Sequence, residues 1–445
     1  MSDAIHAYLC RAGPCSAASV QAALGLSKSS FQRAVSGDKR LLVVGRARAT
    51  RYAARRSIDG LITPVQVYEV DPTGEARHAL TLHPVEPFGC YVESMVPQVE
   101  GGFFEVDPRD MGTDPALDLP WFLQDLKPAG YLGRAAVRAH LAEGYPADLV
   151  RWNGDHVLRY LALHGADATG AFVVGPFALG QLRGSYRGDD VIQTGAEPEA
   201  FVERAQRVSR EAPWGSSPGG EQPKFTATVR GQDGVKRALI VKFSPPMDTP
   251  GGRRWADLLV VEHLAHQVLR DHGVDAARSS VVDGGGRRFL AVERFDRVGE
   301  RGRQGLVSLL PFDRSGVASE LRRWSLVSEP LVAKGILAQA DHERVLWLEA
   351  FGSLIANTDM HLGNLSLRLH GTTVLGLAPV YDMLPMAHAP GHGGELPTRA
   401  YRPEVEGLPA SAREAALDLW ARVLRRDDVS ADYKLIAQDL AASIP

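Results

Sequence analysis

The sequence predicts an α+β fold in which a small helical unit at the N terminus precedes a larger body. The chain has 445 residues, more than one ordinary core holds, so we expect two or three packed units. Its composition, 44% apolar and 23% charged, is typical of folded globular proteins. In addition, polar residues in the C-terminal half, such as Lys242, Glu262 and Asp382, lie on different predicted strands and helices. They could come together only if this half folds as one unit.

Charge is distributed unevenly along the chain. Residues 1–56 contain ten Lys and Arg against two Asp and Glu, whereas the whole chain has a net charge of −3. A basic head therefore precedes an acidic body. No apolar run is long enough to cross a membrane, and Met1 is not followed by a signal-peptide pattern, so we expect a cytoplasmic protein without a membrane partner.

Residues 1–58 are predicted to form a winged helix-turn-helix domain. The stretch SAASVQAALGLSKSSFQRAVS contains two Ser-capped helices joined by a turn at Gly25, and two short strands ending at Tyr52 would form a wing. The second helix would enter a DNA groove and the wing arginines would meet phosphates. A solvated basic face, or a wing docked on the body, would explain the same charge. The candidate DNA-binding residues are Lys28, Ser29, Ser30, Gln32, Arg33, Arg46, Arg48 and Arg51.

Residues 59–204 are predicted to be a mixed α/β region. Short strand-like pieces such as LITPVQVYEV and ARHALTLHPV are broken by Pro and Gly and are followed by helical segments such as GDHVLRYLALHG. We identify no catalytic cluster in this region. Residues 193–212, rich in Glu, Ala and Gln, are expected to form a connecting helix, beyond which the chemistry begins.

The first polar elements beyond this helix are a loop and a strand lysine. Residues 214–225, WGSSPGGEQPKF, could bring backbone N–H groups close to an anion, although a turn between strands would look the same. Lys242 then lies within an apolar strand, where an ammonium needs a partner. The following helix places Glu262 on its apolar face. Such a Lys–Glu pair positions nucleotide phosphates in protein kinases, and a structural ion pair is the alternative.

Further polar positions follow in a recognisable order. The strand at 289–292 ends in charged residues, where a kinase chain would cross between lobes and meet adenine, although a strand edge would look alike. Asp359 and Asn364 have the D-x-x-x-x-N spacing of a kinase catalytic loop, in which the Asp accepts the substrate proton and the Asn binds magnesium. A predicted hairpin then leads to Asp382, a suitable metal ligand. Capping or turn roles for these residues are the alternative.

These stretches resemble the HipA-type bacterial serine/threonine kinases, toxins of toxin–antitoxin systems. The resemblance rests on SPGGEQPKF, VKFS, AVERFDR, NTDMHLGN and PVYDMLP and covers roughly residues 60–430. With its basic helix-turn-helix head, the chain is most similar to the YjjJ-like branch of that family. The resemblance implies a two-lobed, protein-kinase-like (HipA-like) fold, with a HipA-like N-terminal α/β region at 59–204, a kinase core at 205–430 and a C-terminal tail at 431–445.

The resemblance also implies site residues and cofactors, ATP and Mg²⁺. Asp359 would be the catalytic base, assisted by Lys242 and Glu262, and Asn364 and Asp382 would bind the metal. Ser217, or the adjacent Ser216, would be autophosphorylated, and the added charge would repel the nucleotide phosphates and inactivate the enzyme. The implied ATP-binding residues are Gly219, Gly220, Glu221, Gln222, Pro223, Lys224, Lys242, Glu293, Arg294, Phe295, His361, Leu362, Gly363, Asn364, Tyr381 and Asp382.

We therefore expect an ATP- and Mg²⁺-dependent serine/threonine kinase toxin that acts on a protein substrate and binds DNA through its head. Toxins of this family rely on a separate DNA-binding antitoxin, but a chain with its own basic head need not depend on such a partner. Two other hypotheses remain open. One is a transcriptional regulator whose kinase-like body senses a ligand without turnover, and the other is a small-molecule kinase.

Overall fold

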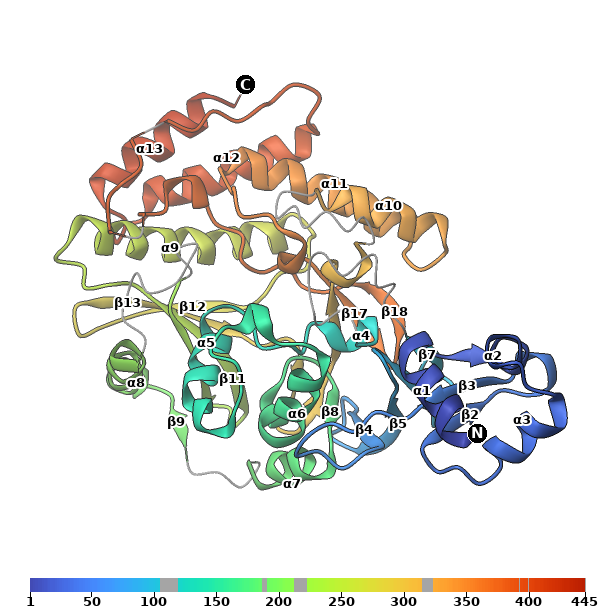
Figure 1. Cartoon of the computed structure of the whole chain (residues 1–445). Coiled ribbons are helices and arrows are strands. Elements are labelled where there is room, and N and C mark those ends of the chain that lie inside the picture. The colour runs from blue at the N-terminus through green and yellow to red at the C-terminus, as the bar shows by residue number, and fades with distance from the viewer. Residues whose placement is uncertain are drawn as a thin grey trace.

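The protein consists of a head, a middle region, a small lobe built on a sheet and a mainly helical large lobe (Figure 1). The chain combines mainly antiparallel sheets with helices that pack on them, which confirms the α+β prediction. The structure, a computed structural model, describes residues 1–104, 119–185, 190–211, 222–313, 323–391, 393–398 and 400–444.

The head, residues 1–58, packs helices against a small sheet with strand order β1-β3-β2. Ser16 Oγ and Ser27 Oγ cap α2 and α3 by accepting hydrogen bonds from backbone N–H groups at 3.1 and 3.2 Å. The predicted helices and strands are present, preceded by α1, which the sequence analysis missed. Their assignment to a winged helix-turn-helix domain stays a prediction. The elements are α1 (Ser2–Ala12), β1 (Cys15–Ser16), α2 (Ala17–Leu24), α3 (Lys28–Val35), β2 (Leu41–Val44) and β3 (Arg51–Ala54).

One face of the predicted wing is covered by the middle region. Leu42 and Ala53, from β2 and β3, form a buried apolar cluster with Val85. The backbone N–H of Arg56 donates a hydrogen bond to the Pro84 carbonyl at 3.0 Å. The head is therefore attached to the body through its strands, while α3 lies on the far side of the head (Figure 1).

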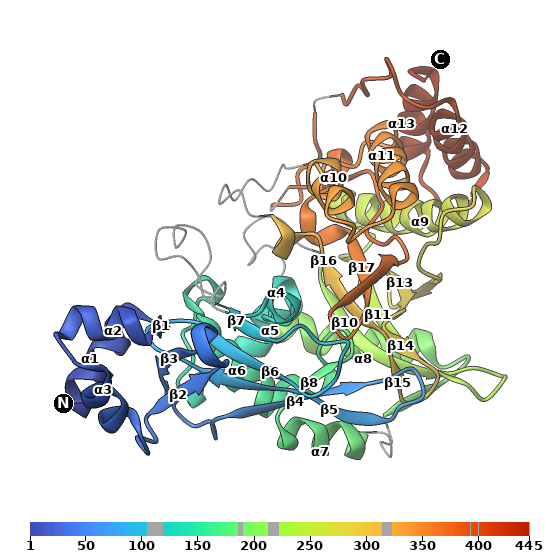
Figure 2. The same ribbon diagram turned by 90° about the vertical axis from the view of Figure 1, so that its right-hand side faces the viewer.

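The middle region is an antiparallel sheet with helices on both faces. Its described strands lie in the order β7-β6-β5-β4-β8. Alternate residues of β8 face opposite sides: Phe172 and Val174 join the main core, whereas Val173 packs against α7. Figure 2 shows α7 below the sheet and α5 and α6 above it. The elements are β4 (Val65–Val70), β5 (Ala76–Pro84), β6 (Cys90–Ser94), β7 (Gly102–Phe104), α4 (Trp121–Gln124), α5 (Gly130–Ala139), α6 (Gly154–His164), β8 (Phe172–Val174) and α7 (Pro176–Ser185).

The small lobe is a sheet with strand order β12-β13-β11-β10-β9, sandwiched between two helices. Phe201 and Ala205 of α8 pack with Phe225 and Phe243 on one face, and Leu259 of α9 packs on the other. The boundary predicted between residues 204 and 205 therefore falls inside α8, because both sides of it bury residues in one cluster. The elements are β9 (Val191–Gln193), α8 (Glu197–Glu211), β10 (Lys224–Arg230), β11 (Lys236–Phe243), α9 (Pro250–Asp271), β12 (Ser279–Gly284) and β13 (Arg287–Glu293).

The large lobe combines short strands with a helical layer that packs on α9 (Figure 1). Residues 431–445 do not form the predicted tail, because Tyr433, Ala437 and Leu440 of α13 are buried in the main core. No helix in the described ranges is long and apolar enough to cross a membrane. The elements are β14 (Arg297–Val298), β15 (Gly302–Arg303), β16 (Gly305–Ser308), α10 (Ser325–Ala333), α11 (Gln339–Leu354), β17 (Ser366–His370), β18 (Thr373–Leu377), α12 (Ala410–Arg425) and α13 (Ala431–Ala442).

Candidate active site

Lys242 joins two carboxylates that are distant in the sequence. Its Nζ donates hydrogen bonds to both carboxylate oxygens of Glu262, at 2.6 and 2.8 Å, and to Asp382 Oδ1 at 2.6 Å. Lys242 comes from β11 of the small lobe, Glu262 from α9 and Asp382 from the loop after β18. The structure thus brings together a predicted strand lysine, a predicted helix glutamate and a predicted metal-binding aspartate.

Burial gives this triad its electrostatic character. The side chains of Lys242 and Glu262 are only 6% and 0% exposed, whereas that of Asp382 is 29% exposed. Burial alone would lower the pKa of Lys242, but Asp382 and Glu262 outweigh it and raise that pKa. Burial raises the pKa of Glu262, although Lys242 opposes it. The pKa of Asp382 is lowered because Lys242 and Lys224 outweigh burial. Asp382 is therefore the carboxylate best suited to remain ionised.

The loop after α11 carries the predicted catalytic aspartate. Asn364 Nδ2 donates a hydrogen bond to the Asp359 carbonyl oxygen at 2.7 Å, which closes the loop across its five-residue spacing. Asn357 Oδ1 accepts a hydrogen bond from the Asp359 N–H at 3.0 Å, and Asn357 Nδ2 reaches the Asp382 carbonyl oxygen at 3.4 Å. Buried Asn357 therefore ties the loop of Asp359 to the loop of Asp382.

The pKa of the Asp359 carboxyl group is raised above its ordinary value. Although the residue is exposed overall, the surrounding protein shields its carboxyl group from water, which is the largest influence raising its pKa. The charge of Asp382 raises this pKa further, whereas His361 lowers it. A carboxylate with a raised pKa is a better proton acceptor, as a general base requires.

Two of the three non-glycine residues with positive φ in the described part of the chain lie in these two loops, and the third is Ala47 in the head. Ala356 has φ 64° and Asp382 has φ 52°, and both are non-glycine residues in the left-handed region. Such conformations persist only where the surrounding structure holds them, and they are frequent at functional sites. Here the Ala387 N–H donates to the Ala356 carbonyl oxygen at 3.0 Å.

Several predicted ATP-binding residues lie close to the triad. Lys224 pairs directly with Lys242 across β10 and β11, and its charge lowers the pKa of Asp359 and Asp382. The rings of Phe295 and Tyr381 lie 5.8 Å apart and join the two lobes. Of the other predicted residues, Gln222, Pro223 and Leu362 are buried, and His361 and Gly363 are half-buried.

Two of the predicted adenine-binding residues direct their side chains elsewhere. The Glu293 carboxylate lies 3.7 Å from Arg237 Nε, and its backbone N–H donates to the Arg278 carbonyl. The Arg294 N–H donates to the Ala238 carbonyl at 2.9 Å. The backbone N–H groups of Glu293 and Arg294 are therefore already bonded to neighbouring parts of the chain. Of residues 293–295, only Phe295 places its side chain near the site, against Tyr381.

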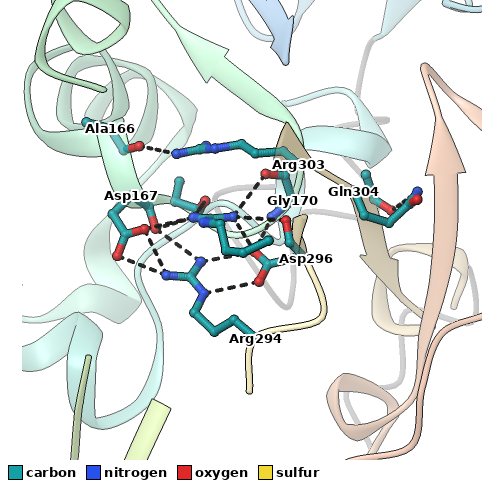
Figure 3. A network of polar contacts seen from close by, with 10 residues as sticks. Ala166, Asp167, Gly170, Arg294, Asp296, Arg303 and Gln304 are labelled. Carbon is teal, nitrogen blue, oxygen red and sulfur yellow. Dashed lines mark hydrogen bonds and ion pairs between the residues drawn. The ribbon is translucent and has the colours of Figure 1, made fainter. Parts of the chain in front are cut away.

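Arg294 instead belongs to a network of ion pairs at the exit of β13 (Figure 3). Its guanidinium contacts Asp167 Oδ1 at 2.8 Å and Asp296 Oδ2 at 3.0 Å, and Arg297 contacts the same two carboxylates at 2.8 and 2.6 Å. The Gly170 N–H also donates to Asp296 Oδ2 at 2.9 Å. Although burial would raise the pKa of Asp296, the arginines lower it. Asp167 and Gly170 of the middle region thereby fix residues 294–297, the segment that connects the two lobes.

Some predicted residues lie outside the part of the chain that the structure describes. They include the glycine loop and both candidate phosphorylation sites. These residues are Ser216, Ser217, Gly219, Gly220 and Glu221.

The sequence analysis missed residues that lie next to the triad and to the loop of Asp359. His266 is fully buried, and its Nε2 lies 3.9 Å from Glu262 Oε1. Burial and, to a smaller extent, the charge of Lys242 lower the pKa of His266 to about 3, so this side chain is neutral. The signal that could have identified it is its spacing, because residues four apart lie on one helix face. Trp324 was missed as well, and its Nε1–H donates to the His361 carbonyl at 2.8 Å.

The candidate DNA-binding residues lie on two parts of the head. Lys28, Ser29, Gln32 and Arg33 are exposed on α3, where Ser30 is half-buried, and Arg46 and Arg48 are exposed between β2 and β3. Arg51 differs from them, because its guanidinium lies over the Phe103 ring of the middle region at 5.7 Å. The structure therefore groups the α3 residues and separates Arg51 from them.

Comparison with known proteins identifies the family. A family model described as "YjjJ-like toxin, middle domain" matches residues 61–183, and another described as "HipA-like C-terminal domain" matches residues 216–441. Toxin YjjJ of Escherichia coli (strain K12) is 36% identical over 97% of this chain and 95% of its own length. The chain belongs to the YjjJ-like toxin family. The resemblance inferred from the sequence motifs is thereby confirmed, and the HipA-like match spans the whole triad.

Two solved structures are similar to this YjjJ-like chain at lower identity. The HipA chain of a Shewanella oneidensis MR-1 complex of HipA, HipB and operator DNA is 16% identical, with a TM-score of 0.39, covering 69% of this chain and 80% of its own. The Helicobacter pylori proinflammatory kinase CtkA is 13% identical, with a TM-score of 0.34, covering 51% of this chain and 88% of its own.

Proposed function

We propose that this YjjJ-like protein is an ATP- and Mg²⁺-dependent serine/threonine protein kinase of the HipA type, acting as a toxin. The observation that carries the proposal is the convergence of Lys242 with Glu262 and Asp382, beside a loop holding Asp359 and Asn364. This set supplies a phosphate-binding cation, a metal-binding carboxylate and a general base. Membership of the YjjJ-like toxin family supports the toxin role.

The donor set fits a magnesium ion. Mg²⁺ prefers oxygen ligands and shares them with phosphates. Asn364 uses its Nδ2 on the Asp359 carbonyl, which leaves its amide oxygen available, and the lowered pKa of Asp382 keeps that carboxylate charged. These two residues would hold the ion, which when bound neutralises phosphate charge in the transition state.

The residues of the chain would then divide the reaction between them. Lys242, oriented by Glu262, would donate hydrogen bonds to the nucleotide phosphates. Asp359 would accept the proton of a serine or threonine hydroxyl as its oxygen bonds to the γ-phosphorus and the bond to ADP breaks. Phe295 and Tyr381, whose rings are in contact, would offer an apolar surface to the adenine.

The proposal is tested by replacing the base. Asp359→Asn keeps the size of the side chain, so we expect a folded protein that loses at least about 99% of its phosphotransfer from radioactive ATP, in line with the contribution of a general base. Asp248→Asn, at an exposed position in the loop before α9, is the matched control and should retain full labelling. Labelling of Asp359→Asn at the wild-type rate would overturn the assignment.

The mass of the intact protein after incubation with ATP separates this proposal from the two alternatives. We further propose that Ser217 or Ser216 is autophosphorylated, which predicts a gain of one phosphate that Ser216→Ala/Ser217→Ala removes. A ligand-sensing regulator predicts no gain and no ATP turnover. A small-molecule kinase predicts ATP turnover only when its substrate is supplied.

A further inference from the structure

Two histidines and one glutamate converge in the middle region, away from the candidate active site. Glu143 Oε1 lies 2.8 Å from His140 Nδ1, and Glu143 Oε2 lies 2.8 Å from His164 Nε2. The two imidazole rings stack with centroids 3.7 Å apart and an angle of 24° between their planes. His140 follows α5, and His164 is the last residue of α6. One carboxylate is thus shared by two imidazoles from different helices.

The surrounding chain holds this cluster in place. The guanidinium of Arg159, from α6, donates a hydrogen bond to the Glu143 carbonyl oxygen at 2.8 Å, which fixes the backbone that carries the carboxylate. The Tyr160 ring contacts both imidazoles, with centroids 6.0 Å from His140 and 5.4 Å from His164. All three side chains of the cluster are partly exposed, by 21 to 36%. The cluster is therefore ordered and still open to solvent.

We propose that His140, Glu143 and His164 bind a divalent metal ion of the zinc class. Two imidazole nitrogens and one carboxylate are the protein ligands of a known type of open zinc site, in which water takes the fourth position. One ligand atom from each residue can be chosen so that all lie within 4.8 Å of one another. Around tetrahedral zinc, with bonds of about 2.0–2.1 Å, ligand atoms are about 3.3 Å apart. Because an imidazole nitrogen binds a metal in the plane of its ring, the two stacked rings would have to turn so that their planes meet at the ion when it binds.

The donor atoms also discriminate between metals. Imidazole favours zinc and other late transition metals, whereas Mg²⁺ favours an all-oxygen environment. A neutral imidazole can place its proton on the ring nitrogen that does not face the ion, so binding requires no charged form of either histidine. The proposed site therefore differs in chemistry from the magnesium ligands at Asn364 and Asp382. An ion bound here would fix the ends of α5 and α6 to each other.

Calorimetric titration of the full-length, chelator-treated protein with zinc chloride tests the proposal in the absence of nucleotide. Wild-type protein should bind one zinc ion at this site, and His140→Gln or His164→Gln should weaken that binding at least about a hundredfold, since even outer-shell changes cost 10- to 100-fold. Mg²⁺ in excess should not compete. The matched control is His83→Gln, which removes a histidine held by a single carboxylate, Glu93, at 3.0 Å.

The outcomes are decisive in both directions. Loss of the zinc site in the His140 and His164 variants, with His83→Gln unchanged, supports the proposal. Absence of saturable zinc binding in the wild type, or an equal loss in His83→Gln, overturns it and leaves a hydrogen-bonded cluster without a metal. Circular dichroism verifies folding of each variant. Zinc should also raise the thermal unfolding midpoint of the wild type but not of Glu143→Gln, which supplies a second measurement if one histidine variant fails to fold.

Discussion

At the scale of single residues, the burial of Lys242 calls for an explanation. An ammonium in the protein interior loses its hydration and must be compensated by close carboxylates. Glu262 compensates it from a fully buried position, and Asp382 does so from a partly exposed one. The triad is therefore open to solvent at Asp382, and it is there that we expect a nucleotide phosphate to bind.

Removing the lysine should destabilise the protein strongly. Lys242→Met leaves the Glu262 carboxylate buried without its counter-ion, so we expect the free energy of unfolding to fall by about 3–5 kcal/mol. Glu262→Gln in the same chain removes the uncompensated charge, and the double variant should be more stable than Lys242→Met alone. Urea denaturation of the two single variants and the double variant measures this coupling. Strictly additive losses would show that the two groups do not depend on each other.

At the scale of elements, α9 shows which part of the site the sequence could predict. Its apolar stripe identifies the buried face, and Glu262 was predicted from its place on that face. Lys242 was predicted in the same way, as a charge inside an apolar strand. Local periodicity gives no distance between elements, so it could not show that Asp382 reaches Lys242.

The segment after β13 illustrates the opposite case. The sequence showed that charged residues follow the strand, and the family resemblance suggested that Glu293 and Arg294 hold adenine. In the structure, the Arg294 guanidinium is bound by Asp167 and Asp296 instead (Figure 3). Asp167 lies 127 positions earlier in the chain, and such a long-range ion pair leaves no local pattern in the sequence. The direction of a charged side chain depends on its tertiary partners.

This network predicts a large difference between two aspartate variants. Asp296 is 5% exposed and faces two arginines, so Asp296→Asn should lower the free energy of unfolding by about 3–5 kcal/mol. Asp283 pairs with Arg288 but is 52% exposed, so Asp283→Asn should cost less than about 1 kcal/mol. Urea denaturation of both variants provides the comparison. Equal losses would mean that the network contributes no more than a surface pair.

The pH dependence of the same network has a defined sign. The pKa of Asp296 is lower in the folded protein than in the unfolded chain, so its stabilising effect is complete above about pH 4, the ordinary range of an Asp carboxyl. The effect should decline as the pH falls below this value, towards the lowered pKa. The difference in unfolding free energy between wild type and Asp296→Asn should therefore shrink on acidification below pH 4. A difference that stayed constant would exclude ionised Asp296 as its source.

At the scale of the whole molecule, the fold class could be predicted from the order of the motifs, but the packing of the head and of α13 on the body could not. Family signature stretches occur in a fixed order, and this order was sufficient to predict the α+β class. The helix α13 and the docking of β2 and β3 depend on apolar packing that exists only in the folded chain, through Tyr433 in one case and Val85 in the other. A sequence pattern cannot distinguish a tail from a docked helix when its partner surface lies elsewhere.

The docking of β2 and β3 on the middle region changes how DNA binding by the head should be tested. Deleting residues 1–58 would uncover Val85, which packs against Leu42 and Ala53, and the truncated body would expose an apolar patch. Charge reversal on α3 avoids this problem because Lys28 and Arg33 are exposed. We expect Lys28→Glu/Arg33→Glu to weaken binding to a mixed-sequence 30-base-pair duplex, measured by fluorescence anisotropy, at least about tenfold at low salt.

The control must change the net charge by the same amount. Arg11→Glu/Lys39→Glu does so at exposed positions of the head that lie outside α3. If α3 faces the DNA, the Lys28/Arg33 variant should also show a shallower dependence of affinity on salt, by about one unit of slope for each phosphate that is no longer neutralised. Equal weakening in both variants would instead indicate a diffuse basic surface, and unchanged affinity in the α3 variant would exclude this helix from the DNA interface.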